Sequence, residues 1–327
     1  MATYYVDPAA TGSNLGTIDD PWVSLQSAAN TAVAGDTVLC RGSQTLTTAI
    51  SFATNSGNTN SGFIKFIGCN SSWENDGAYF ELNGNSSSAN GVYINGRIFL
   101  YFENIRVSLC TGIGFNHATA YWYHCVFNNC KADNNGSHGF DLYYDGANGE
   151  CNYFFRCIAA NNGGSGFYRA YRRTFLTMCV AKNNASYGID LGDATLSSAI
   201  FGCLVNDNAH GIRSRGGVFM GNVVDGSTSG IGIELSASGT IPGLVFGNRL
   251  TNNTSWGLSV QHLHLYGWNF INGNTAGQIT GNGFAEMDGG VDTNLTTGTQ
   301  GYVDRANKDF NLTSDATLRR VPVTLPS

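Results

Sequence analysis

A unit of about 20 to 27 residues recurs between residues 112 and 277, and this repeat restricts the fold more than any other feature. Its clearest copies have a cysteine, an Asn-Asn pair four and five residues later, and a glycine nine residues after the cysteine. These copies begin at Cys130, Cys157 and Cys179, and a looser copy begins at Cys203. Short runs of Phe, Ile, Val and Leu without a 3.6-residue period lie between the turns, which indicates strands rather than helices.

The Asn and Gly positions of the repeat predict turns that stack above one another, because both residues tolerate left-handed backbone. A chain of short strands joined by equivalent turns fits a solenoid of parallel strands, a parallel β-helix, with coils about 4.8 Å apart. In such a stack each amide side chain can donate to the one below it. The Asn-Asn pairs are therefore expected to form ladders along the rod.

Two phases of the strand after each repeat cysteine fit the pattern. In the first, the cysteines and the small residues two positions later face the core, and Ile158, Val180 and Leu204 point outward as an apolar stripe. That stripe would be a candidate interface. In the second, shifted by one residue, these three side chains are core and the cysteines are exposed. The sequence alone does not choose between the two.

The net charge of the chain limits the kinds of partner that it can bind. The chain has 17 Lys and Arg against 23 Asp and Glu, a formal net charge of -6, and no basic patch, which argues against nucleic acid. The sequence contains no run of 18 apolar residues, so we expect no membrane span. The first residues lack a charged segment followed by an apolar one, so we expect synthesis without a signal peptide.

The nine cysteines are an odd number, and four occupy one repeat position, so we expect a stack of reduced thiols. The sequence contains no Cys-x-x-Cys motif and no Cys/His spacing typical of a zinc site. We therefore expect no metal or other cofactor. Calcium is a weaker alternative that would use Asp141, Asp145, Asp190 and Asp193. None of these residues lies in a typical calcium-binding loop.

The two ends of the chain differ from the repeat. Residues 4–7 suggest a strand, and Asp19 or Asp20 before Pro21 suggests a helix start. The helix would cover the open end of the solenoid as a cap. The expected organisation is a cap at 1–38, a β-helix body at 39–284, and a C-terminal loop and tail for capping or attachment at 285–327.

The N-terminal segment carries a resemblance in Tyr4-Tyr-Val-Asp-Pro8, Trp22-x-x-Leu-Gln-x-Ala-Ala29 and Ala32-x-Ala-Gly-Asp-Thr-Val38. It resembles the cap of the right-handed parallel β-helix, or pectin-lyase-like, superfamily. This implies an all-β, right-handed parallel β-helix with a short N-terminal capping helix. The segments 40–44, 63–69 and 309–320 are also similar to β-helix proteins of tailed phages. The superfamily includes polysaccharide lyases, glycosidases, phage tailspikes and non-catalytic virion proteins, so the fold does not select a function.

The residue two positions after each repeat glycine forms an outward column of polar and aromatic side chains. The column contains Asn116, Asp141, Tyr168, Asp190, Arg213, Glu234 and Ser259. Aromatic faces stack on sugar rings and carboxylates act on glycosidic bonds, so the column and its neighbours suggest a carbohydrate groove. The candidate glycan-binding residues are Asp141, Tyr143, Tyr144, Tyr168, Arg169, Tyr171 and Arg215.

The catalytic candidates are Asp190, Arg213 and Glu234. The two carboxylates would lie two coils apart, about 9 to 10 Å, near the upper limit for an inverting glycosidase. An arginine between them would pair with both and keep them ionised, which opposes a role as proton donor. A salt-bridged surface ladder would explain the same residues. His138, Tyr187 and His210 each precede a repeat glycine and are interpreted as stacked turn residues.

Two functions follow. The first is a non-catalytic structural or adhesive β-helix of a phage virion, either a head decoration or a tail spike or fibre, with affinity for polysaccharide. Its partners would be other virion proteins and itself as a homotrimer, and it would be made in the host cytoplasm and released by lysis. The alternative is a polysaccharide lyase or glycoside hydrolase. The missing leader and the poorly formed catalytic set favour the first.

Overall fold

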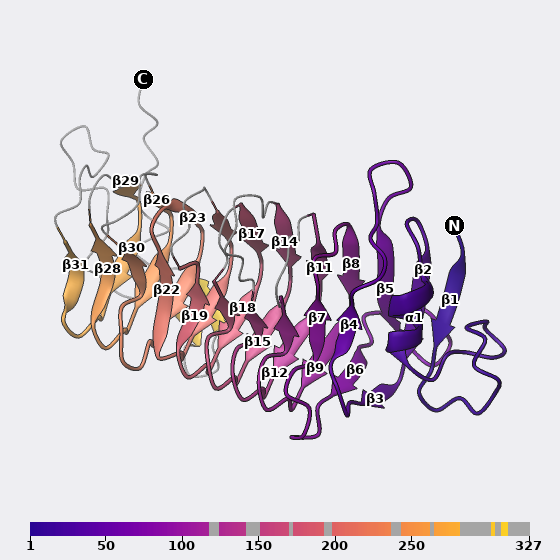
Figure 1. Cartoon of the computed structure of the whole chain (residues 1–327). Coiled ribbons are helices and arrows are strands. Elements are labelled where there is room, and N and C mark those ends of the chain that lie inside the picture. Colours follow the sequence, from indigo (N-terminus) through magenta and orange to yellow (C-terminus); the bar gives the residue numbers. More distant parts are fainter. Residues whose placement is uncertain are drawn as a thin grey trace.

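The computed structural model shows a rod of stacked coils that begins beside the helix α1 (Leu25–Thr31) and runs to strand β31 (Gly277–Thr280) (Figure 1). The structure describes residues 1–117, 124–141, 151–169, 173–192, 198–236, 243–261 and 265–281, and the backbone of two further short strands. Three parallel sheets of 11, 10 and 10 strands form the sides of the rod, here called sheets A, B and C. The prediction of an all-β parallel β-helix is confirmed.

Sheet A begins with the first strand of the chain. Its strands are β1 (Thr3–Val6), β2 (Thr37–Arg41), β5 (Ile64–Cys69), β8 (Leu100–Glu103), β11 (Val126–Asn128), β14 (Asn152–Phe155), β17 (Thr174–Thr177), β20 (Ala199–Phe201), β23 (Gly217–Met220), β26 (Gly243–Phe246) and β29 (Leu265–Gly267).

From β2 on, sheet B follows sheet A in each coil, after a loop at residues 70–79 between β5 and β6 and after a short turn in the other coils. Its strands are β3 (Ser43–Thr45), β6 (Phe80–Asn83), β9 (Ile105–Ser108), β12 (Lys131–Asp133), β15 (Ile158–Ala160), β18 (Val180–Lys182), β21 (Leu204–Asn206), β24 (Val223–Asp225), β27 (Arg249–Thr251) and β30 (Phe270–Asn272).

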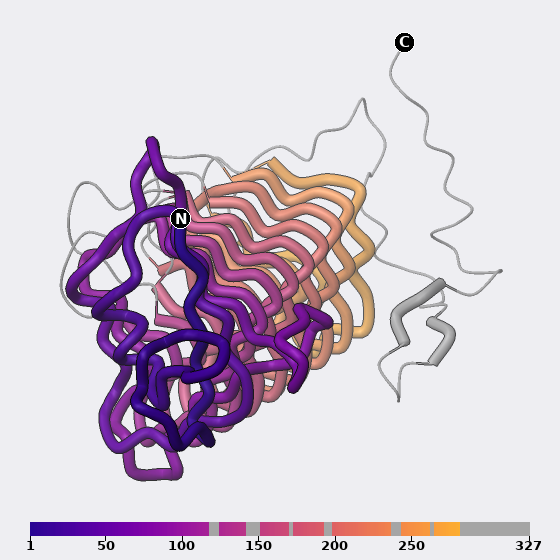
Figure 2. The backbone as a smooth tube through the Cα atoms, turned by 90° about the vertical axis from the view of Figure 1, so that its right-hand side faces the viewer, coloured from indigo at the N-terminus to yellow at the C-terminus, as the bar shows by residue number. Residues whose placement is uncertain are grey.

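Sheet C completes each coil. Its strands are β4 (Ile50–Phe52), β7 (Val92–Ile94), β10 (Phe115–Asn116), β13 (Phe140–Asp141), β16 (Phe167–Tyr168), β19 (Tyr187–Asp190), β22 (His210–Ser214), β25 (Ile233–Leu235), β28 (Trp256–Val260) and β31 (Gly277–Thr280). Seen from the end of the rod, the coils follow one another almost in line (Figure 2), so equivalent residues form columns.

The core resolves the phase of the cysteine column. Cys130, Cys157, Cys179 and Cys203 are at most 1% exposed, whereas Ile158, Val180 and Leu204 point outward and are half-buried. The first of the two phases is therefore correct. In the later coils the same position holds asparagine, since the register places Asn222 after Cys203 and Asn248 after Asn222. All nine cysteines are free thiols.

The two residues of each Asn-Asn pair have different roles. The first takes the left-handed conformation, with φ of 57° at Asn134 and 54° at Asn183. The second is buried and joins an amide ladder, in which Asn135 donates to Asn162 at 3.1 Å and Asn162 donates to Asn184 at 2.9 Å. The ladder predicted from the sequence is confirmed.

The N-terminal helix caps the open edge of sheet C. Helix α1 (Leu25–Thr31) lies beside β4, and the Gln26 side chain donates to the Ser51 carbonyl at 2.9 Å and accepts from the Ser51 N–H at 2.7 Å. The capping role is confirmed, but the predicted helix start is wrong. Ser24 is the N-cap, and the Asp20 carboxylate instead accepts loop N–H bonds.

Near the C-terminus, β32 (Tyr302–Asp304) and β33 (Asp309–Leu312) pair antiparallel. The described part of the chain contains no helix long and apolar enough to cross a membrane.

Candidate functional site

The outward column predicted from the repeat lies on the outer face of sheet C. Backbone register places Asp141 beside Tyr168, Tyr168 beside Asp190, Asp190 beside Arg213, and Arg213 beside Glu234. Each member comes from the next coil, so neighbouring positions are about 4.8 Å apart. The two carboxylates Asp190 and Glu234 are separated by two coils, as expected.

Aromatic residues that precede the repeat glycines lie along the same face. His138 stacks on Tyr168 with ring centroids 3.8 Å apart, and Tyr187 stacks on His210 at 4.6 Å. We call the resulting set the sheet C patch. It consists of His138, Asp141, Tyr168, Arg169, Tyr187, Asp190, His210, Arg213 and Glu234.

The remaining candidates lie outside this set. Arg215 lies two residues after Arg213, beyond the end of β22, and is half-buried. Tyr143, Tyr144 and Tyr171 lie outside the described residues.

Asp190 is the most enclosed charge of the patch, with 2% of its side chain exposed. Arg213 donates to both of its carboxylate oxygens, at 3.0 Å from Nε and 2.6 Å from Nη2. The Gly192 N–H donates a third bond at 2.9 Å. The hydrogen bonds to Asp190 raise the pKa of Arg213 above its usual value. This bidentate geometry holds the guanidinium in a fixed orientation against the carboxylate.

Glu234 takes a different partner from the one expected. It accepts a hydrogen bond from the Tyr187 hydroxyl at 3.4 Å, and the direct ion pair of Arg213 is with Asp190. The prediction that one arginine pairs with both carboxylates is therefore wrong. The arginine side chain reaches back one coil, over the Tyr187 ring at 4.5 Å, and this leaves Glu234 to the tyrosine. Burial, followed by the nearby Glu234, raises the pKa of Tyr187.

A second group with the same residue types lies in the preceding coils. Arg169 pairs with the buried Asp141 at 3.3 Å, and its guanidinium lies 4.5 Å from the centre of the Tyr168 ring. His138 accepts the Ser165 N–H at Nδ1 over 2.9 Å, and burial, followed by the charge of Arg169, lowers its pKa to about 4. The imidazole is therefore neutral at pH 7, with its proton on Nε2.

These contacts define what the patch can do chemically. The rings of Tyr168 and Tyr187 pack against histidine and arginine, so the patch offers a ligand mainly polar tips rather than open ring faces. Its buried carboxylates are ion-paired, whereas a general acid requires a carboxyl that keeps its proton near neutral pH. The geometry favours hydrogen bonding to a ligand over proton transfer.

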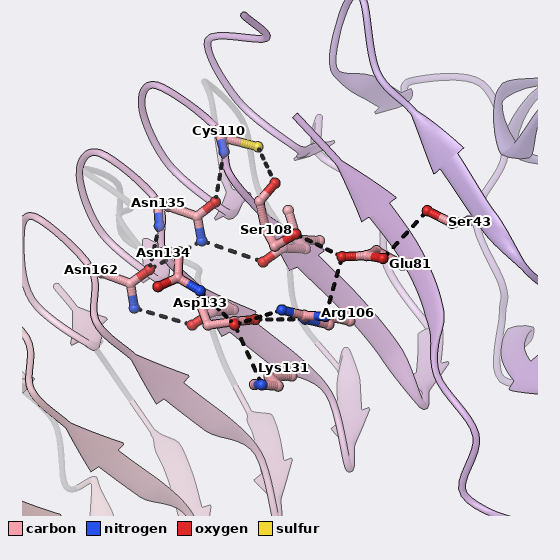
Figure 3. A network of polar contacts seen from close by, with 12 residues as sticks. Ser43, Glu81, Arg106, Ser108, Cys110, Lys131, Asp133, Asn134, Asn135 and Asn162 are labelled. Carbon is pink, nitrogen blue, oxygen red and sulfur yellow. Dashed lines mark hydrogen bonds and ion pairs between the residues drawn. The ribbon is translucent and has the colours of Figure 1, made fainter. Parts of the chain in front are cut away.

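The outer face of sheet B shows what a simple salt-bridged ladder looks like in this protein (Figure 3). Arg106 bridges Glu81 at 3.2 Å and Asp133 at 2.8 Å, and Lys131 approaches Asp133 at 3.4 Å. Ser43 extends the ladder to Glu81. The residues drawn include no aromatic ring, in contrast to the sheet C patch.

The proposed interface stripe also lies on sheet B, where Ile158, Val180 and Leu204 align in register. Among the described residues no group of three or more His, Cys, Asp or Glu side chains could hold a metal ion.

Comparison with solved structures identifies several carbohydrate-active proteins with this architecture. A pectate lyase, Pel9A, has a TM-score of 0.73 at 18% identity and covers 94% of this chain and 84% of its own. A rhamnogalacturonan lyase has a TM-score of 0.55 at 15% identity, and the match covers 85% of this chain and 75% of the lyase. The A-module of the mannuronan C-5 epimerase AlgE4 from Azotobacter vinelandii has a TM-score of 0.52 at 13% identity, covering 90% and 98%.

These identities are low, so the similarity concerns the fold and not the chemistry. A search of curated protein sequences found no match. The family model for the right-handed β-helix region matches residues 112–297, more than half of the chain. The chain therefore belongs to the right-handed β-helix family.

Proposed function

We propose that the protein is a non-catalytic β-helix that binds polysaccharide along the sheet C patch. The observation that carries this proposal is the ladder from Asp141 to Glu234, in which polar side chains recur coil after coil and both arginines are paired with buried carboxylates. Such a ladder is rigid before a ligand arrives, so binding costs little side-chain ordering.

A polymer is the ligand that suits a repeated ladder. Hydroxyl, imidazole, guanidinium and carboxylate tips at intervals of about 4.8 Å can donate to and accept from the hydroxyls of successive sugars. The similar folds of a pectate lyase and a rhamnogalacturonan lyase support a carbohydrate ligand by analogy.

The charge of the patch favours a neutral polysaccharide over a polyuronate. Apart from its histidines, the patch has two arginines against three carboxylates, a formal charge of −1. The chain as a whole carries −6. A polyuronate would meet like charge at the patch, and its carboxylates would have to compete with Asp141 and Asp190 for the arginines.

Binding can be tested by affinity electrophoresis in gels that contain neutral glucans, galactans or mannans, or polygalacturonate or alginate. Retardation by at least one neutral polymer is expected, with weaker retardation by the polyuronates. Glu234→Gln and Tyr187→Phe, which preserve shape, should each weaken binding by roughly 5- to 20-fold, as expected for a lost hydrogen bond to a charged or phenolic group.

Glu81→Gln is the matched control, because Glu81 is also a half-buried glutamate in an outward ladder, but on sheet B. It should bind like the wild type. Equal loss in the control and in Glu234→Gln, or retention by polyuronates alone, would contradict the proposal.

The specific observation that favours an enzyme is the extent of the similarity to the pectate lyase, which covers most of both chains. On this alternative, release of unsaturated or reducing ends from polygalacturonate, rhamnogalacturonan or another polymer would be abolished by Asp190→Ala, Arg213→Ala and Glu234→Ala. We expect no such release from the wild type.

Attachment to a phage particle, through other virion proteins, is part of the same proposal. Mass spectrometry of purified particles from a phage that carries the gene tests it. Tens to hundreds of copies per particle would support a head decoration, and a few copies would support a tail spike or fibre. Absence from particles would remove this part of the proposal and leave the binding activity as a separate question.

A further inference from the structure

The strands of sheet A carry no charged side chain after β8, and their outward side chains become mainly apolar from β14 on. From β14 to β29, six consecutive strands contain no Asp, Glu, Lys, Arg or His. Backbone register aligns their outward positions in two columns, in which Ala199 and Gly267 are buried. One column is Tyr153, Phe175, Ala199, Val218, Leu244 and Leu265. The other is Phe155, Thr177, Phe201, Met220, Phe246 and Gly267. We call these twelve residues the sheet A face.

The other two sides of the same coils provide an internal comparison. Sheet C carries Asp190, Arg213 and Glu234 outward, and sheet B carries Lys182 and Arg249 outward. The lack of charge on the sheet A face is therefore specific to one side of the rod and does not follow from the low charge of the chain.

Large apolar side chains on this face remain open to solvent. Phe155 is 40% exposed and Met220 is 48% exposed. At the adjoining corner, Met178 is 62% exposed and Trp268 is 57% exposed. Tyr153 stacks on Phe175 at 5.1 Å, so part of the surface is already ordered.

The size and composition of the face suit the centre of a protein interface. The six strands span five spacings of about 4.8 Å, and each strand is about 13 Å long, so the face covers about 300 Å². A stable interface buries about 800 Å² per partner, of which the centre is apolar, rich in aromatic residues and Met, and poor in charge. The sheet A face matches that centre, and the polar flanks of the rod would supply the rim.

We propose that the sheet A face is a self-association surface that pairs two copies of this chain, rod against rod, about a two-fold axis. In a two-fold interface the same surface of each copy contacts the other, so a charged residue near the axis would face a like charge. A face without charged side chains avoids this repulsion. A partner with charged side chains would bury them unpaired against this face. A second copy brings an equally long, charge-free face with the same coil spacing, and two sheet faces pack well about 10 Å apart.

This pairing differs from the trimer and from the stripe of Ile158, Val180 and Leu204 expected from the sequence, because it uses another side of the rod. It also leaves the sheet C patch on a separate face, so self-association and polysaccharide binding can be tested independently.

Sedimentation equilibrium of the full chain between 1 and 100 µM tests the proposal. We expect a concentration-dependent mass that approaches twice the 34.8 kDa of one chain. Phe155→Glu and Met220→Glu, each at an exposed position, should weaken dimerisation by roughly 100-fold or more, because the new charge would be buried without a partner. Circular dichroism and thermal unfolding should show that both variants remain folded.

Val180→Glu is the matched control, an outward half-buried residue in the same group of coils but on sheet B. It should dimerise like the wild type. The proposal would be overturned by a wild type that is monomeric at 100 µM or trimeric. Dissociation caused by Val180→Glu and not by the sheet A variants would overturn it as well.

Discussion

Asn184, in the middle of the buried amide ladder, allows a quantitative test of what holds the coils together. Its side chain is 2% exposed and makes four hydrogen bonds. The Oδ1 atom accepts from the backbone N–H and the side-chain amide of Asn162, at 3.2 and 2.9 Å. The amide nitrogen donates to the Ala159 carbonyl at 3.1 Å and to Asn208 at 2.8 Å.

Asn184→Ala removes all four bonds. The Asn162 side chain keeps its bond to the Ala132 carbonyl, but the Asn162 N–H loses the acceptor that the ladder provides. A buried N–H without a partner costs about 1–3 kcal/mol, and each further lost bond costs about 0.5–1.5 kcal/mol. With one unpaired N–H and three further lost bonds, we expect the free energy of unfolding to fall by about 2.5–7.5 kcal/mol.

Urea denaturation followed by circular dichroism measures this loss. Because a solenoid can open in parts, hydrogen exchange at the amides of 162 and 184 should accompany it. Asn183→Gly is the control, since Asn183 is the exposed, left-handed partner in the same turn and glycine adopts that conformation freely. It should change stability by less than about 0.5 kcal/mol. Equal effects of the two substitutions would refute the ladder as a major source of stability.

Three further predictions concern single residues. Arg213→Leu leaves the buried Asp190 without its ion pair, so the free energy of unfolding at pH 7, measured by urea titration, should fall by about 2–3 kcal/mol. Adding Asp190→Asn should recover much of this loss, and no recovery would contradict the pairing. Burial holds the pKa of His138 near 4, against about 6.5 when unfolded, so stability should fall as pH drops from 7 towards 4, by at most about 2–3 kcal/mol given its partial exposure. His138→Gln should remove that part of the pH dependence, and an unchanged slope would count against it. Met178 has φ of 54° at an exposed corner where the next coil has Gly202. In thermal unfolding, Met178→Gly should stabilise the protein by about 0.5–1 kcal/mol and Gly202→Ala should destabilise it by about 1 kcal/mol. The reverse order would show that the left-handed backbone at this corner is not strained by a side chain.

The repeat made the fold readable from the sequence, because one correct assignment applies to every coil. The Asn-Asn pairs and the column from Asp141 to Glu234 lie where the repeat spacing placed them. The phase of the cysteine column was undecidable because the outward neighbours Ile158, Val180 and Leu204 are as apolar as core residues. Only the three-dimensional packing distinguishes them.

Other features depend on contacts that spacing does not encode. Asp20 looks like a helix cap but closes a loop, because its carboxylate reaches the N–H groups of Ser13 and Asn14. Arg213 was expected between two carboxylates and binds one, because its side chain bends over Tyr187. The sheet A face was missed because strands such as Gly243–Phe246 are apolar on both sides, so no alternation marks the outward residues.

The measurement that tests binding without cleavage most directly is the chain length of a polysaccharide that the protein retains. The polymer is incubated with excess protein for a day, and its size distribution and unsaturated ends are then determined. We predict retention of the polymer, an unchanged length and no new ends, with retention reduced by Glu234→Gln. Shortening of the polymer that Glu234→Gln or Arg213→Ala prevents would contradict the proposal and establish an enzyme.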